Sequence, residues 1–198
     1  VSCILSNLVL NGGVKLGDIT FGYDTLRTGY GVNVLQDVVT TITPSSHQVR
    51  LRSGQVLEYD RLVVAPGVSF DPVLGLEEDI VRPDAEKLVP HAWIAGPQTL
   101  NLQRQLLTLP RRGVVVMTIP PKPYRCPPGP YERACVIADF LKRKKRGAKL
   151  LVLDANPGIV AEPHTFSTAF NGIYKNVVEY IPNAELKRVS FQTSAKGA

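Results

Sequence analysis

The second half of the chain holds two continuous apolar runs with a helical stripe of apolar residues between them. Residues 113–119 and 149–153 are rich in valine, leucine and isoleucine, which is typical of strands buried on both faces of a parallel sheet. Between them, residues 131–146 carry apolar side chains at helical spacing, at Ala134, Ile137, Ala138 and Leu141. Strand, helix and strand in this order predict a βαβ unit, and hence an α/β fold class with a parallel sheet.

The first half is patterned for antiparallel strands. Residues 38–42 are rich in β-branched side chains, and residues 48–52 and 55–59 alternate apolar and polar positions on either side of a Ser-Gly turn. This pattern predicts a strand followed by a hairpin. Residues 23–27 predict a short helix. Residues 61–67 form an apolar run that ends at Pro-Gly, and we interpret this run as another strand buried on both faces.

Prolines interrupt residues 68–98, which we interpret as a crossover between two domains. Residues 99–109 then predict a helix that ends at Pro110, because proline lacks the N–H that would continue it. We therefore assign residues 1–98 to the C-terminal part of one domain and the crossover, and residues 99–198 to a second domain.

The chain is basic, with 23 lysines and arginines against 17 acidic residues and a net charge of +6. Its densest run, residues 142–146, either complements the dipole at the end of the predicted helix or steers an acidic protein partner. We expect no nucleic-acid partner, because aromatic residues are not interleaved with this run. No apolar run reaches the roughly 18 residues of a membrane helix, so no transmembrane segment is expected.

The cysteines offer no metal-binding spacing. Cys3, Cys126 and Cys135 form no Cys-x-x-Cys pair, and the histidines stand apart from them, so we expect no metal site. The odd number fits either a partner thiol elsewhere in a longer protein or buried cysteines that act as small hydrophobic side chains.

The loop before the predicted helix of the second half lacks the glycine-rich turn of a dinucleotide site. It carries prolines instead, and proline offers no N–H to a phosphate. Asp154 ends the following strand, where a ribose-binding acid would stand, but an acid alone does not establish a nucleotide site. The sequence therefore predicts a second domain without a nicotinamide phosphate loop.

Cys126 is the candidate for chemistry in this loop. It lies next to Arg125 and a few residues before the helix, and both a cation and a helix N-terminus favour a thiolate over a thiol. Glu132, in the first helical turn, suits the helix dipole and could also relay a proton. Two interpretations remain open: a redox or nucleophilic thiol, or a packed thiol on a rigid loop. We interpret Cys135, on the helix body, as structural.

Residues 124–134, with the sequence Tyr-Arg-Cys-Pro-Pro-Gly-Pro-Tyr-Glu-Arg-Ala, resemble the signature loop of the flavin-binding subunit of flavocytochrome c sulfide dehydrogenase. Residues 3–7, 22–27, 59–67 and 90–93 resemble the same family in the same order. The resemblance implies two Rossmann-like three-layer domains arranged as in glutathione reductase, the first of them incomplete. No Gly-x-Gly-x-x-Gly loop occurs in the sequence, so we expect these residues alone to hold no complete FAD site.

The resemblance also implies site residues. The covalent thioether of the family, from a cysteine to the 8α-methyl of FAD, falls on Cys3. The redox-active cysteine facing the flavin falls on Cys126, and the active-site glutamate on Glu132. The strand residue whose backbone lies against the adenine falls on Val39. The tripeptide that passes the flavin falls on Ala65, Pro66 and Gly67.

The activity implied by the resemblance is sulfide oxidation in the periplasm. Sulfide would attack a disulfide between Cys126 and a cysteine outside this chain, and electrons would pass through FAD to a c-type cytochrome subunit. Two alternatives remain open. One is a sulfide:quinone or NAD(P)H-dependent relative with the same fold, and the other is a degenerate, non-catalytic scaffold module.

Overall fold

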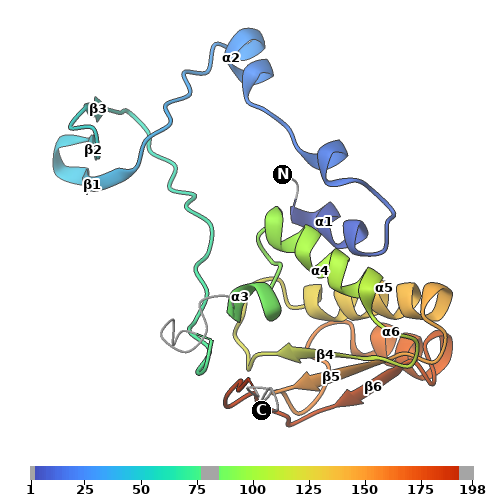
Figure 1. Ribbon diagram of the computed structural model, residues 1–198. Coiled ribbons are helices and arrows are strands. Elements are labelled where there is room, and N and C mark those ends of the chain that lie inside the picture. The colour runs from blue at the N-terminus through green and yellow to red at the C-terminus, as the bar shows by residue number, and fades with distance from the viewer. Residues whose placement is uncertain (1–2, 77–84, 192–198) are drawn as a thin grey trace, which may run out of the picture. The chain divides into compact units, whose positions relative to one another are not determined.

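The computed structural model describes residues 3–76 and 85–191, which fall into two compact units (Figure 1). The smaller unit is Gly22–Asp71, and the larger one combines the segments before and after it. Each unit is described by itself below. The division into domains at residues 98 and 99 stays a prediction.

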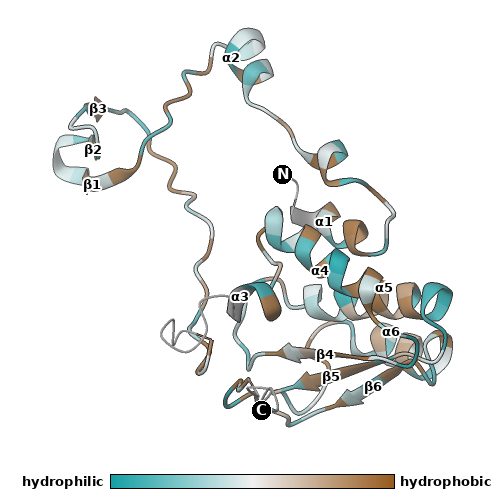
Figure 2. Cartoon of the chain, viewed as in Figure 1, coloured by the Kyte–Doolittle hydropathy of each residue, from teal (hydrophilic) through white to brown (hydrophobic). Residues whose placement is uncertain are grey.

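The larger unit is built on a three-stranded parallel sheet in the order β4-β5-β6. Its strands are β4 (Val114–Ile119), β5 (Lys149–Asp154) and β6 (Val178–Ile181). Helix α5 (Gly129–Lys144) connects β4 to β5, so the predicted βαβ unit is confirmed. Figure 1 shows α5 lying along one face of this sheet, and in Figure 2 β4 and β5 are drawn largely in the colour of hydrophobic residues.

The core of this unit lies between α5 and the sheet. Helix α5 buries one apolar stripe, and the central strand β5 meets it with alternate residues whose side chains are fully buried, Leu150 and Val152. Each large apolar side chain buried in this way contributes about 1.5–3 kcal/mol to folding. The buried residues of the stripe are Tyr131, Ala134, Ile137, Ala138 and Leu141. The N-terminal end of α5 is thereby fixed against the carboxyl ends of β4 and β5.

The remaining elements of this unit pack around that core. Helix α1 (Cys3–Leu10) lies against α4 (Pro97–Thr108), and the Gln103 amide donates to the Val9 carbonyl between them. Helix α4 agrees with the predicted helix of residues 99–109. Shorter elements are η1 (Leu16–Ile19), α3 (Ala85–Leu88), α6 (Pro163–Thr168) and the π-turn η3 (Ala169–Ile173). Within the described ranges, no helix has both the length and the apolar composition needed to cross a membrane.

The smaller unit contains the predicted antiparallel strands. Its elements are α2 (Asp24–Tyr30), β1 (Val39–Thr43), η2 (Pro44–Ser46), β2 (Gln48–Leu51) and β3 (Val56–Glu58). The sheet order is β1-β2-β3, with both pairs antiparallel, so the predicted helix, strand and hairpin are confirmed.

The prediction of a buried strand at residues 61–67 is wrong. These residues are extended but unpaired, and Val63 and Val64 are 87% and 62% exposed. Burial on both faces requires a strand on each side and helices above and below. No strand among the described residues pairs with this segment, so its apolar side chains stay exposed.

Candidate functional site

The turn that carries Cys126 leads directly into α5. Cys126 is exposed and has a left-handed backbone with φ of 58°, which is uncommon for a residue other than glycine. Its carbonyl accepts a hydrogen bond from the Gly129 N–H at 2.9 Å, and the Pro128 carbonyl accepts one from Glu132 N–H at 3.0 Å. These bonds close the first turn of the helix against the loop. The proline loop therefore ends with the thiol presented at the helix N-terminus.

Gly129 allows the thiol to lie against the start of the helix. A Cβ atom at this position would be 3.2 Å from Cys126 Sγ and 3.7 Å from the Trp93 Cζ3 atom. A side chain here would thus crowd the sulfur, because the first of these distances is shorter than ordinary van der Waals contact. The sulfur, the helix backbone at Gly129 and the edge of the Trp93 ring form one cluster, which we call the thiol cluster.

A buried arginine stands behind this cluster. Arg133, on α5, is 5% exposed, and its guanidinium carbon lies 3.4 Å from the centroid of the Trp93 ring. It donates three hydrogen bonds, to the carbonyls of His91 and Ala92 at 2.6 and 2.7 Å and to the Asn7 side-chain oxygen at 2.9 Å. Burial lowers the pKa of Arg133 to about 9, which still leaves it a cation at neutral pH.

The proline loop is anchored at its other end by Asp154, the last residue of β5, which is completely buried. One carboxylate oxygen accepts the hydroxyls of Tyr131 and Tyr180, each at 2.7 Å. The other accepts the Asn156 backbone N–H at 2.9 Å and the Asn156 side-chain amide at 2.8 Å. Four donors therefore occupy both oxygens.

Asn156 extends this network into the loop. Its side chain accepts from Lys122 N–H and donates to the Pro120 carbonyl, both at 3.0 Å. On the helix side, burial raises the pKa of Tyr131 far above its ordinary value, so its phenol stays a donor to Asp154. The loop is thus held at its start through Asn156 and at the helix through Tyr131.

The other predicted residues around the loop differ in their surroundings. Glu132 and Arg125 are exposed, and Glu132 occupies the first turn of α5 close in sequence to the Cys126 turn. No hydrogen bond or ion pair between described residues joins Cys126 to Glu132. Cys135 is half-buried, and burial raises the pKa of its thiol to about 11. No group of three or more metal-ligating side chains is found within residues 3–76 and 85–191.

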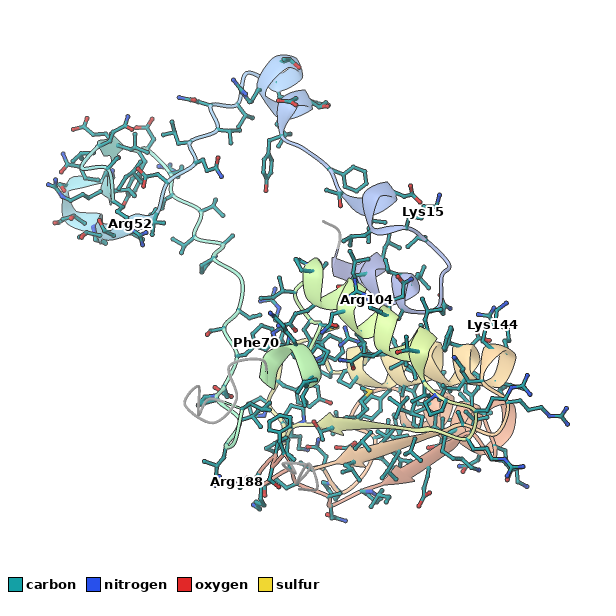
Figure 3. The ribbon with its side chains drawn as sticks, viewed as in Figure 1. Lys15, Arg52, Phe70, Arg104, Lys144 and Arg188 are labelled. Atoms are coloured by element: carbon teal, nitrogen blue, oxygen red, sulfur yellow. The ribbon has the colours of Figure 1, made fainter. Side chains whose placement is uncertain are left out.

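The basic run lies at the opposite end of α5. Figure 3 labels Lys144 there, and Lys142, Arg143 and Lys144 are all exposed. Lys145 donates to the Leu107 carbonyl at 2.6 Å and Lys142 to the Ile173 carbonyl at 3.0 Å. Part of this charge therefore complements backbone carbonyls at the end of the unit, as expected for cations near helix C-termini.

The residues predicted to contact a flavin lie in both units. Cys3 is the first residue of α1, and Val39 is the first residue of β1. Ala65, Pro66 and Gly67 are exposed in the unpaired segment of the smaller unit.

Within the smaller unit, the backbone around Gly67 has room for the edge of a flat ring. Gly67 has φ of +85° with open space where a Cβ would stand, so a flat ring could approach its backbone closely. Residues 62–69 form no backbone hydrogen bond with another described residue, so their N–H and C=O groups can bind a polar ring edge. The pyrophosphate has no glycine-rich loop to bind within the 198 residues.

Sequence reasoning missed two of the residues that organise the site. Arg133 belongs to the motif of residues 124–134, but no role was predicted for it, because arginine side chains are mostly exposed. The available signal was its place between Tyr131 and Ala134, both fully buried. Trp93 contributed to the family resemblance, but its position in the chain gave no indication that it would reach the helix N-terminus.

Comparison with known proteins identifies a family for the chain. A family model for the central region of the flavoprotein chain of sulfide dehydrogenase (flavocytochrome c) matches residues 99–197, the part that contains the proline loop and α5.

Two solved structures share the fold. The sulfide:quinone oxidoreductase of the hyperthermophilic bacterium Aquifex aeolicus superposes with a TM-score of 0.68 at 21% identity, over 96% of this chain and 44% of that one. The putidaredoxin reductase structure, solved as a covalent complex with putidaredoxin, gives a TM-score of 0.62 at 18% identity, over 90% of this chain and 39% of that one. The chain therefore spans less than half the length of either structure.

Proposed function

Because this chain belongs to the family of the flavocytochrome c sulfide dehydrogenase flavoprotein chain, we propose that it forms part of an FAD-dependent enzyme that oxidises sulfide. The observation that carries this proposal is the exposed Cys126 thiol, held in a left-handed turn against the N-terminus of α5. A thiol that serves only packing would be buried within the core instead.

In the proposed reaction Cys126 forms a disulfide with a cysteine outside this chain. Hydrosulfide attacks one sulfur of that disulfide, so that a new sulfur–sulfur bond forms and the old one breaks. One cysteine then carries a persulfide, and the other leaves as a thiolate that holds the electron pair. Glu132, which lies in the first turn of α5, would accept the proton released from sulfide.

FAD, when bound, would supply the two-electron acceptor as the thiolate sulfur forms a bond to the outer sulfur of the persulfide, and a c-type cytochrome would then take these electrons one at a time. Cys3 would hold the flavin through a thioether, and Val39 and Ala65 to Gly67 would lie along it. The compartment that suits this acceptor is the periplasm. If Cys3 carries the flavin, acid-denatured protein keeps its yellow chromophore and a Cys3→Ala variant releases it. Free flavin released from the unaltered protein would contradict the thioether.

The hydrogen bonds of Asp154 argue against the alternative of an NAD(P)H-dependent enzyme. A ribose hydroxyl needs an accepting carboxylate, and both oxygens of Asp154 are already occupied by four internal donors. The preceding loop also presents prolines where a pyrophosphate requires N–H groups. We therefore infer that NADH is not the electron donor.

The proposal is tested by sulfide-driven reduction of the flavin in the intact protein. Cys126→Ser keeps the size of the side chain but removes the disulfide, so the rate of flavin bleaching by sulfide should fall by orders of magnitude. Reduction of the flavin by dithionite should be unaffected. Cys135→Ser, in the body of α5, is the matched control, and its flavin should be reduced by sulfide at the unaltered rate. Flavin reduction by sulfide at that rate in Cys126→Ser would rule out the mechanism.

A further inference from the structure

The guanidinium of Arg133 is buried, and among residues 3–76 and 85–191 its partners are neutral oxygens and an aromatic ring. The side chain is 5% exposed, and no described carboxylate lies within ion-pair distance. Removing a cation from water costs several kcal/mol, which neutral carbonyls offset only in part. An apolar residue at this position of α5 would extend the buried stripe without that cost. Since burying this charge costs folding free energy, the presence of arginine at this position requires an explanation other than stability.

The guanidinium organises the segment before α4. It binds the carbonyls of His91 and Ala92 with two of its nitrogens and stacks on the ring of Trp93, so that one rigid group fixes all three residues. The segment cannot be fixed by regular secondary structure, because Ala92 is fully buried in a left-handed conformation with φ of 51°. The direction of the Trp93 side chain therefore depends on Arg133.

We propose that Arg133 is a positioning residue for Cys126. It holds the Trp93 ring in place, and this ring forms one wall of the thiol cluster. The edge of that ring and the Cys126 sulfur approach the same point beside Gly129, at 3.7 and 3.2 Å from the position of a Cβ. The inference rests on the function proposed above for Cys126.

Arg133 also ties α1 to the same place. Its Nε donates to the side chain of Asn7, which follows Cys3 by about one helical turn. One buried cation thus links the helix of the proposed flavin attachment, the Trp93 wall and the helix that carries the redox thiol at its start. An ordinary hydrophobic contact would not fix these three segments with comparable directional precision.

The test is the rate at which iodoacetamide modifies Cys126 in the folded, intact protein after its disulfides have been reduced and the reductant removed, followed by peptide mapping. Arg133→Lys keeps the charge but loses the planar fork and the stack on Trp93. Trp93→Phe removes the outer ring that borders the thiol. Each variant should raise the rate about threefold or more, and the double variant should match the single ones, because coupled residues are not additive. Arg143→Lys, an exposed arginine on the same helix, should leave the rate unchanged.

Three results would overturn the proposal. The first is an unaltered rate in Trp93→Phe, which also decides the question if Arg133→Lys does not fold. The second is a double variant whose effect is the product of the two single effects, and the third is an unaltered rate in folded Arg133→Lys. The reaction with iodoacetamide needs no sulfide. It therefore tests the role of Arg133 even if the Cys126→Ser experiment shows that the proposed reaction is wrong. A role for Arg133 in stability alone would lower the melting temperature and leave the rate in folded protein unchanged.

Discussion

Cys126 and Cys135 belong to the same α5 region, yet their surroundings have opposite chemical consequences. Cys126 lies just before the helix, exposed, in a left-handed turn beside Gly129 and Trp93. Cys135 lies in the helix body, half-buried against the core, where burial raises the pKa of its thiol to about 11. The helix position of a cysteine decides whether its sulfur meets solvent and the helix N-terminus or the apolar side chains of the sheet.

The largest expected difference is in alkylation. At pH 8 only about a thousandth of a thiol with a pKa near 11 is ionised, against about a tenth at the ordinary pKa of 9.0, so the raised pKa alone should slow alkylation of Cys135 about 100-fold. The exposed Cys126 should therefore react with iodoacetamide much faster than Cys135. Peptide mapping after timed quenching measures both rates in one sample. The Cys135 rate should rise about tenfold for each pH unit toward its pKa. Equal rates at pH 8 in folded protein would remove the distinction between the two sites.

The same raised pKa affects stability. The unfolded thiol ionises near its ordinary pKa of 9.0 and the folded one near 11, so between these values the unfolded state binds fewer protons. The contribution of Cys135 is therefore complete below pH 9 and is lost as the pH rises through 11. The melting temperature of Cys135→Ala should decline less steeply over this window than that of the unaltered protein.

A smaller effect is expected for Glu132, the acid in the first turn of α5. Glu132→Gln keeps the helix and removes the proton acceptor, so sulfide-driven flavin reduction should slow by about 100-fold. Asp139→Asn is the matched control. Asp139 lies on the same helix and pairs with Arg143 at its exposed surface, where an ion pair contributes little. Stopped-flow absorbance measures both variants. Similar losses in the two would point to a general effect of helix charge.

The smallest expected effect comes from the backbone contact at Gly129. Gly129→Ala places a methyl group 3.2 Å from the Cys126 sulfur, which must shift by a few tenths of an ångström. The alkylation rate of Cys126 should change about twofold while the melting temperature stays the same or rises, because alanine favours helix. Gly172→Ala, with open space at its Cβ, is the control. An unchanged Cys126 rate would show that the sulfur does not depend on this contact.

The sequence predicts elements well where the pattern that defines them is local. The βαβ unit and the hairpin are specified by periodicity within each segment, and both are confirmed. Residues 61–67 show the limit of this reasoning, because an apolar run becomes a buried strand only if partners exist on both sides. Helix α6, η3 and β6 were not predicted, since residues 163–181 mix apolar and polar positions without a clear period.

The candidate site shows the same limit at the level of single residues. Cys126 and Glu132 were identified because a loop and a helix start are visible in the sequence. Arg133 and Trp93 were missed because their contact joins segments far apart in the chain, and no local pattern encodes it. The sequence places Asp154 where a ribose-binding acid would stand, but it does not show which groups the carboxylate binds. Its four hydrogen bonds come from Tyr131 on α5, Tyr180 on β6 and Asn156 two residues on, so they depend on two further segments.

The locked state of Asp154 sets a condition for any redesign of this protein into a nicotinamide-dependent reductase. Introducing a glycine-rich turn in place of the prolines would supply phosphate donors, but the carboxylate would remain turned inward on its two phenols. Freeing it would require replacing both tyrosines and accepting the exposure of an anion that now holds the loop through Asn156. The carboxylate that a nicotinamide cofactor would need is thus the one that holds the cysteine loop in place. An evolutionary path from the cysteine loop to a nicotinamide site would pass through variants that have neither of these sites.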